Sequence, residues 1–250
     1  MIKEINLTIK NAIMAGTVVM KIFKAKRMFS LMLVISWWIT GSTQTKPAGE
    51  YYTRLTHADF RNEPEFSKSL NFGNIDFDRL QAILFFLTNE VRVKNRLKPL
   101  EYSEKLEQTA EMHANDMVAK DFFSHLNTSD NRKKTPNDRA RLSGISNPFL
   151  AENIIEGYGL RYTANETVYT PGRGKFSETP DGELLQTHTY LSFGETLIKN
   201  WMNSKDHRKN ILAPEALQLG CAVAYFVDSG FNDMPSFKAV QNFQWYQPVK

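Results

Sequence analysis

The strongest pattern in the sequence is a set of three segments whose apolar residues recur every three to four positions. The first runs from about residue 77 to residue 97 behind Asp76, the second follows Ser103, and the third covers about residues 192–203. This spacing predicts three amphipathic helices, the first two with an N-cap. The apolar face of the first consists of Leu80, Ile83, Leu84, Leu87 and Val91, and the polar positions predicted off that face are Asn89, Glu90, Arg92 and Lys94.

A second pattern, the alternation of apolar and other residues, predicts strands. It occurs at residues 150–155, where Glu152 and Asn153 interrupt an otherwise apolar run. It returns at residues 217–225 and 237–245, and the turn-rich segment between them predicts an antiparallel hairpin. Helices and strands together predict a mixed α and β domain.

The remaining segments lack a clean period, and their composition guides the interpretation. Residues 44–74, rich in polar, proline and aromatic residues, are predicted to be a linker that leads into the domain. Residues 138–141 predict a short helix ended by Gly144, with its arginines at the surface or capping the helix. Residues 158–192, rich in turn signals, are interpreted as an insertion, with a flap as one interpretation and His188 as a bystander.

The charge of the chain is concentrated at its N-terminus. The 250 residues carry a formal charge of +4, with 31 basic and 27 acidic residues. Residues 1–44 contain six basic residues and one acidic residue, which leaves 25 basic and 26 acidic residues, a net charge of −1, for residues 45–250. A nucleic-acid-binding domain would need its basic excess in the folded part. We therefore expect no nucleic-acid partner.

The N-terminal segment has the pattern of a secretory signal peptide, predicted to cover residues 1–43. Basic residues at 21–27 precede an apolar run at 28–39, and small residues follow at 41–43. The run is shorter than the roughly 20 residues of a membrane-spanning helix. An uncleaved anchor is the alternative, and it would be the only contact with a membrane. The residues before Met20 are unusual for a signal, so Met20 is a candidate for the true start.

Four dispersed polar residues are the candidates for a functional site: His125, Glu152, Ser204 and His207. His125 follows two phenylalanines, which predicts that the rings are buried and that the imidazole faces a cavity. His207 follows the helix anchored by Trp201, across a small polar loop. Glu152 must be paired or face a wet pocket, because burying an isolated carboxylate is too costly. A structural salt bridge is the alternative for Glu152.

Two imidazoles and one carboxylate are suitable ligands for a divalent ion such as zinc, with a position left for water. They are equally suitable for a hydrogen-bonded acid–base cluster, and spacing alone does not bring them together. His113, on or beside the buried face of the second helix, is predicted to be a core histidine. The chain contains no H-E-x-x-H, paired-cysteine, G-x-S-x-G or P-loop motif.

Five motifs in order resemble the CAP superfamily, which comprises the cysteine-rich secretory proteins, antigen 5 and pathogenesis-related 1, also called the SCP domain. They are Leu87–Leu100, Ala110–Ala114, Phe123–His125, Ala151–Ile154 and Trp201–Leu212. The likeness is to the disulfide-free bacterial branch, and the chain has a single cysteine, which excludes an intramolecular disulfide. A disulfide-free exported domain fits a bacterial envelope or secreted protein.

The resemblance implies an α+β fold over residues 75–250, a three-layer α-β-α sandwich with a central antiparallel sheet and a cavity at one face. The insertion at 158–192 departs from the family. The family lines its cavity with two histidines and two glutamates. These match His125, Glu152 and His207, and the second glutamate falls at Ser204. Members hold a divalent metal through the two histidines, so the implied metal ligands are His125 and His207, with zinc as the expected ion.

Three functions follow as hypotheses. The first is a secreted, non-enzymatic binding module whose ligand is a lipid, a cell-wall component or another protein. The second is a metal-assisted hydrolase of the peptidase type, in which His125 and His207 hold the ion and Glu152 activates its water as general base. The third is a purely structural hydrogen-bond network that holds the layers together.

Overall fold

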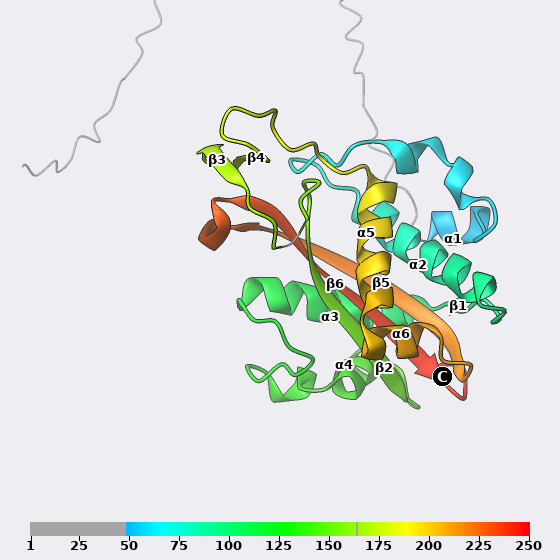
Figure 1. Ribbon diagram of the computed structural model, residues 1–250. Helices are drawn as coiled ribbons and strands as arrows, with labels where there is room; N and C mark the ends of the chain where they lie inside the picture. The colour runs from blue at the N-terminus through cyan, green and yellow to red at the C-terminus, as the bar shows by residue number, and fades with distance from the viewer. Residues whose placement is uncertain (1–48, 164) are drawn as a thin grey trace, which may run out of the picture. The chain divides into compact units, whose positions relative to one another are not determined.

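The computed structural model describes residues 49–163 and 165–250, which fold into helices packed on both faces of a central sheet (Figure 1). The predicted signal peptide and the candidate start at Met20 lie outside the described residues. Within the described part of the chain, no helix is both long enough and apolar enough to cross a membrane.

The central sheet has the strand order β1-β5-β6-β2. The predicted hairpin is formed by β5 (Ala216–Asp228) and β6 (Met234–Trp245), which are antiparallel. β2 (Leu150–Tyr158) pairs antiparallel with β6, with Glu152 opposite Asn242. At the other edge the two-residue strand β1 (Glu101–Tyr102) runs parallel to β5. The fold is α+β with a mainly antiparallel central sheet, as predicted.

The helices form the two outer layers of an α-β-α sandwich. One layer contains α2 (Phe77–Lys94) and α5 (Tyr190–Asn203), and the other contains α3 (Glu104–Ala119) and α4 (Pro136–Leu142). A short helix, α6 (Lys205–Ile211), follows α5 and contacts β2. The three-layer architecture confirms the fold class that the resemblance implied.

Alternation along the strands explains the two layers, because successive side chains point to opposite faces. Odd-numbered residues of β5 and β6 join the core formed with α2 and α5: Leu219, Cys221, Val223, Phe237, Ala239 and Phe243. Even-numbered residues of the sheet pack against α3 with Ala110, Ala114 and Met117: Ile154, Ala222, Ala224 and Val240. The sheet is therefore buried on both faces.

Helix α2 differs from the prediction at two polar positions. Asp76 caps it as predicted, and its side chain accepts a hydrogen bond from Arg79 N–H. Asn89 and Arg92, predicted off the apolar face, are nevertheless buried. Asn89 exchanges hydrogen bonds of 2.6 and 3.0 Å with the backbone of Leu100, and the Arg92 guanidinium donates to backbone carbonyls that include that of Ile211. The chain folds back over this side of the helix and supplies these partners.

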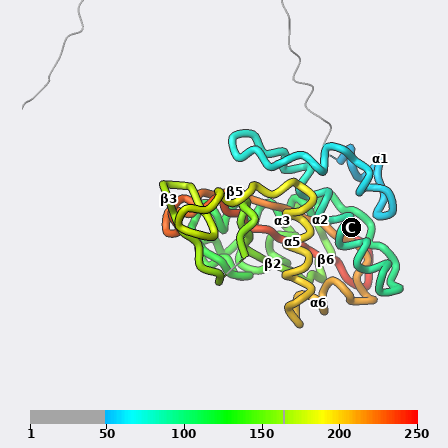
Figure 2. The backbone as a smooth tube through the Cα atoms, turned by 45° about the horizontal axis from the view of Figure 1, so that its top comes forward, coloured from blue at the N-terminus to red at the C-terminus, as the bar shows by residue number. Residues whose placement is uncertain are grey.

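The predicted linker is wrong for its described part, residues 49–74. This segment contains α1 (Glu50–Arg54) and two short 3-10 helices, and it lies beside α2 (Figure 2). Tyr51, Phe60 and Phe66 are buried in the same core as α2 and α5. The segment lacks a helical or strand period because its aromatic residues are inserted singly from irregular backbone.

The segment interpreted as an insertion has a small apolar core of its own. A two-stranded sheet, β3 (Tyr169–Gly172) and β4 (Lys175–Ser177), forms within it. Buried Leu160 and Phe176 pack with Met234 at the end of the β5–β6 hairpin. His188 is buried, its Nδ1 lies 2.9 Å from the hydroxyl of Ser192, and burial lowers its pKa to about 4.

Candidate functional site

The carboxylate of Glu152 is the centre of the candidate site. Its side chain is 1% exposed, and it lies on the face of β2 that packs against α3 and α4. Its Oε1 lies 2.9 Å from His125 Nδ1, and its Oε2 accepts a hydrogen bond of 2.7 Å from Arg139. With its amide oriented to satisfy both of its polar atoms, Asn242 also donates to Oε2, at 3.2 Å. Both oxygens of this buried carboxylate are therefore engaged.

Arg139 corrects the expectation for residues 138–141. Its guanidinium is buried on α4, whereas the side chain of Arg141 is 60% exposed, as predicted. The Thr135 capping box begins the helix, and Gly144, at a φ of 76°, follows its end. Arg139 donates to the backbone carbonyl of His125 in addition to its ion pair with Glu152. The helix period alone does not show that Arg139 pairs with the carboxylate of Glu152, which comes from a distant part of the sequence.

Three buried side chains hold the backbone of residues 122–125 by its carbonyl groups. Lys238 Nζ lies 3.1 Å from the carbonyl oxygen of Phe122, and His113 Nε2 lies 2.9 Å from that of Ser124. Arg139 Nη1 lies 3.2 Å from the carbonyl oxygen of His125. Fixed donors of this kind preorganise a side chain at the rim of a site. His125 therefore projects from a segment whose backbone is anchored to the core.

His125 itself is at the surface, with 48% of its side chain exposed. Its Nδ1 contacts Glu152, and its Nε2 makes no hydrogen bond to any of the described residues. The expectation that both preceding phenylalanines are buried is wrong for Phe123, which is 49% exposed. Phe122 alone packs inward, beside the α3 cluster. Asp121, at a φ of 48°, turns the chain before this segment.

His207 lies on α6 rather than after a polar loop. Trp201, fully buried as predicted, donates its indole N–H to the carbonyl of Ile154 and holds the end of α5 against β2. Asn153 on β2 donates to the carbonyl of His207 at 3.2 Å. Burial is the main cause that lowers the pKa of His207 below its ordinary value of 6.5, which favours the neutral imidazole at pH 7.

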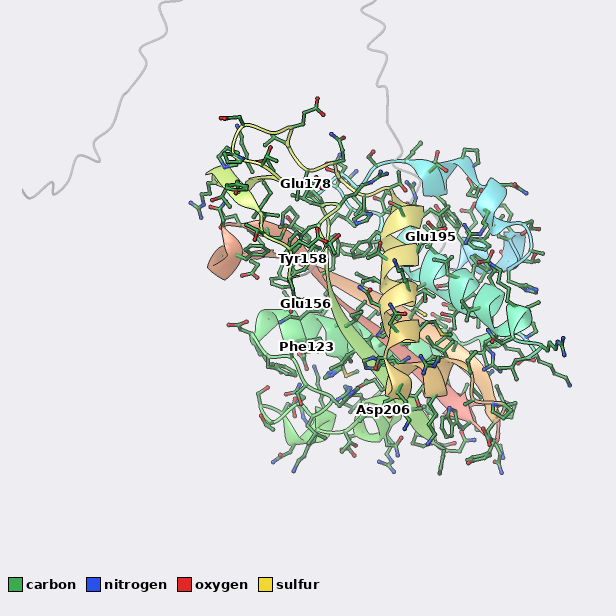
Figure 3. All side chains as sticks on the ribbon, viewed as in Figure 1. Phe123, Glu156, Tyr158, Glu178, Glu195 and Asp206 are labelled. Atoms are coloured by element: carbon green, nitrogen blue, oxygen red, sulfur yellow. The ribbon has the colours of Figure 1, made fainter. Side chains whose placement is uncertain are left out.

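Ser204 joins α5 to α6, one helical turn before His207, and its hydroxyl makes no capping bond. In Figure 3, Phe123 marks the segment that leads to His125, and Asp206 marks the helix that carries His207, with β2 between them. The structure therefore joins His125 to Glu152 directly and places His207 nearby on the neighbouring helix.

His113 is a member of the site that the sequence did not reveal. It is fully buried, as the core prediction required, but its Nε2 lies 3.8 Å from Glu152 Oε1. Burial lowers its pKa to about 4, so it is neutral at pH 7. The carbonyl of Ser124 can only accept, so Nε2 carries the proton. Lys238 and Arg139 were missed in the same way, because no local pattern links them to residues 122–125.

The donor set does not match a zinc centre with three or four protein ligands. Among residues 49–163 and 165–250, no group of three or more His, Cys, Asp and Glu side chains is arranged to hold a metal ion. Glu152 is committed to Arg139 and His125. The arrangement instead resembles a carboxylate that orients an imidazole, because an engaged Nδ1 leaves Nε2 as the outward atom.

The fold and the site together define an α-β-α sandwich domain with a histidine–glutamate cluster on the strand at one edge of its sheet. The chain belongs to the CAP family, described as the cysteine-rich secretory protein family, whose family model matches residues 85–243. The resemblance stated from the five motifs is confirmed. Cys221 is free and buried, in agreement with the disulfide-free bacterial branch.

Bacterial proteins are among those to which the chain is similar. The uncharacterized protein YkwD of Bacillus subtilis (strain 168) is 31% identical over 144 residues, which are 58% of this chain and 41% of that protein. The chain thus spans about two fifths of the length of this curated relative. An extracellular SCP-domain protein from Bacillus anthracis str. Ames matches with a TM-score of 0.46 and 21% identity, over 68% of this chain and 41% of the other. A cysteine-rich secretory protein from Staphylococcus aureus subsp. aureus Mu50 matches with a TM-score of 0.41 and 18% identity, over 68% and 39%.

Proposed function

We propose that this protein is an extracytoplasmic binding module whose ligand contacts the surface around His125 and His207. Export is supported by the signal pattern of residues 1–43. The binding role rests on one observation, the engagement of both oxygens of the buried Glu152 carboxylate. A general base must reach the proton that it abstracts, and Glu152 is covered. Glu152 therefore acts by orienting His125.

An exchangeable divalent ion fits this proposal better than a permanent one. His125 and His207 would supply two imidazoles, and the lowered pKa of His207 favours the neutral imidazole at pH 7, the form that coordinates a metal. With no third protein ligand in the described part of the chain, water or a ligand group would complete the coordination. The ion would give the site a positive charge for a carboxylate, phosphate or similar group of a lipid, cell-wall or protein ligand.

A second candidate, the metal-assisted hydrolase, is favoured by the contact between Glu152 and His125. A carboxylate that holds Nδ1 of an exposed imidazole is the orienting pair of many acid–base sites. In that case the outward Nε2 of His125 would be the base, and Glu152 would position it. The base role proposed for Glu152 from the sequence is disfavoured, since the carboxylate is buried.

Zinc titration of the full chain by calorimetry tests the proposal. The comparison is between the unmodified protein, the His125→Ala/His207→Ala double variant and the control His57→Ala, which removes an imidazole elsewhere. We expect one weak site that the double variant loses and the control keeps. Absence of binding to the unmodified protein would reject the metal part of the proposal.

Hydrolysis assays on the same proteins separate the remaining functions. Turnover of a fluorogenic casein or ester substrate that disappears in His125→Ala would reject the binding module in favour of the hydrolase. The structural hypothesis predicts a different result, in which His125→Ala lowers the melting temperature and leaves zinc binding unchanged.

A further inference from the structure

A groove on the far side of α6 has no role in the site described above. Its volume is about 560 Å³. We call it the basic–aromatic groove after the side chains that define it, which are Lys205, Arg208, Lys209, Trp245 and Tyr246. Leu212, Ala213, Pro214 and Glu215 complete its lining. Figure 1 shows α6 close to the end of β6, where Trp245 is the last strand residue.

The two sides of α6 carry different chemistry. Lys205, Arg208, Lys209 and Leu212 follow the spacing i, i+3, i+4, i+7, so they share the side that lines the groove. His207, Asn210 and Ile211 share the other side. Asn210 donates to Asn153 on β2 at 2.9 Å, and Ile211 is buried. The groove and the histidine site are therefore separate surfaces joined by one short helix.

The three cations of the groove lack acidic partners. All three are exposed, and no carboxylate of the described residues lies within 4.0 Å of them, although Arg208 donates to the carbonyl of Met202. Elsewhere most arginines of the domain are paired; Arg61, for example, contacts both Glu90 and Glu195. Glu215 is the single acid in the groove lining. The groove lining therefore has a net charge of +2, whereas residues 45–250 together have a net charge of −1.

The aromatic side of the groove is held in an unfavourable backbone conformation. Tyr246 has a φ of 64° and is 58% exposed, and its N–H donates to the carbonyl of Glu215 at 2.9 Å. A bulky residue in the left-handed region is uncommon, and such strain clusters at binding sites. The Tyr246 ring meets Phe149, itself 54% exposed, with centroids 5.0 Å apart, and Trp245 at 6.1 Å. The strain therefore presents a cluster of rings beside the cations.

We propose that the basic–aromatic groove binds an anionic saccharide chain. The apolar faces of sugar rings pack on aromatic side chains, and Lys and Arg bind carboxylate or phosphate groups on such chains. A nucleic acid would require more phosphate contacts than three cations beside Glu215 supply. A lipid surface would require a protruding apolar patch, whereas these residues line a recess. This site is additional to the proposed metal-capable site, so either can fail without the other.

The experiment measures binding of three probes to the full chain by calorimetry at low and at physiological salt. The probes are a galacturonic acid oligomer, phosphorylated maltoheptaose and the neutral maltoheptaose. The groove variants are Lys205→Glu/Lys209→Glu and Tyr246→Asn, because Asn tolerates the left-handed backbone. The control Arg161→Glu/Lys175→Glu reverses the same number of exposed charges in the 158–192 segment. Circular dichroism confirms that each variant is folded.

We expect binding of at least one anionic oligomer, at least tenfold tighter than that of maltoheptaose and weakened by salt. Each groove variant should weaken it at least tenfold, and the control should not. The relative affinities of the two anionic oligomers identify carboxylate or phosphate as the recognised group. Three results would overturn the proposal: no anionic oligomer binds, the control weakens binding as much as the groove variants, or single-stranded DNA or phosphatidylglycerol vesicles bind more tightly through the same residues. Unchanged zinc binding in the groove variants would show that the two sites are independent.

Discussion

The two faces of the central sheet are built from alternate residues of the same strands, yet they are stabilised differently. The face toward α2 and α5 is mainly apolar, with Phe237, Phe243 and their neighbours packed on helix side chains. The face toward α3 and α4 buries Glu152, Lys238 and Asn242 among small apolar residues. The first face is held by burial of apolar area, and the second also by hydrogen bonds and an ion pair between buried polar groups.

The difference explains where the candidate site lies. Truncating a side chain in an apolar core lowers the free energy of unfolding in proportion to the buried apolar groups that are lost, and the neighbouring side chains partly relax into the space. Removing one partner from a buried polar network leaves another buried group without its hydrogen bond or counter-charge. The polar face therefore tolerates fewer substitutions than the apolar face. Its hydrogen bonds also hold the backbone of residues 122–125 and the His125 ring in place. A site that needs a fixed imidazole is accordingly found on this face.

The largest expected effect is that of Arg139→Met on the polar face. This substitution leaves the buried Glu152 carboxylate without its counter-charge. We therefore expect a loss of about 3–5 kcal/mol in the free energy of unfolding, measured with urea at pH 7. The double variant Arg139→Met/Glu152→Leu, which removes both charges, should lose less. Arg61→Met, which breaks the surface ion pairs with Glu90 and Glu195, should cost less, about 1 kcal/mol. A double variant as unstable as the single one would contradict this account of the polar face.

An intermediate effect is expected at Glu107, where α3 begins. Burial raises its pKa to about 7, despite hydrogen bonds from the hydroxyls of Tyr52 and Tyr102 that act in the opposite direction. Its ordinary value is 4.5, so protonation is favoured in the folded state, and the resulting stability is lost as the pH rises from about 4.5 through 7.

Glu107→Gln should remove this pH dependence. The unfolding free energy of the unmodified protein should fall relative to that of the variant between pH 5 and pH 8, by on the order of 2–3 kcal/mol. Denaturant titrations at each pH measure the difference. Glu104→Gln, an exchange at an exposed position of the same helix, is the control and should follow the unmodified protein. If the free energies of unfolding of the unmodified protein and Glu107→Gln changed in parallel with pH, the raised pKa of Glu107 would be rejected.

The smallest effect is expected for a conservative change on the apolar face. Ile83 is fully buried on α2, against Gly194 of α5. Ile83→Val should cost about 0.5–1.5 kcal/mol, visible as a small fall in the melting temperature, because one methylene is lost and the core relaxes around it. Val93→Ala, at a position 41% exposed, is the control and should change stability little. A cost for Ile83→Val as large as that of Arg139→Met would remove the contrast between the faces.

Local patterns predicted most of the regular structure. The helix period and the Asp76 and Ser103 caps predicted α2 and α3, which begin where expected, and α5 begins two residues earlier than predicted, behind Thr189. Alternation predicted β2 and the β5–β6 hairpin. These features depend on contacts between residues a few positions apart, which a sequence shows directly. The motifs that identified the family, including His125 and Glu152, are local in the same sense.

By itself, then, the sequence determined the fold class, the family and the identity of the candidate residues. Only the tertiary structure decided that Arg92 and Arg139 are buried, that His113 lies beside Glu152, and that the segment before α2 belongs to the core. The physical reason is that a polar side chain is buried when a partner from a distant part of the chain satisfies it. Hydropathy and spacing describe one segment at a time, so they cannot show that partner.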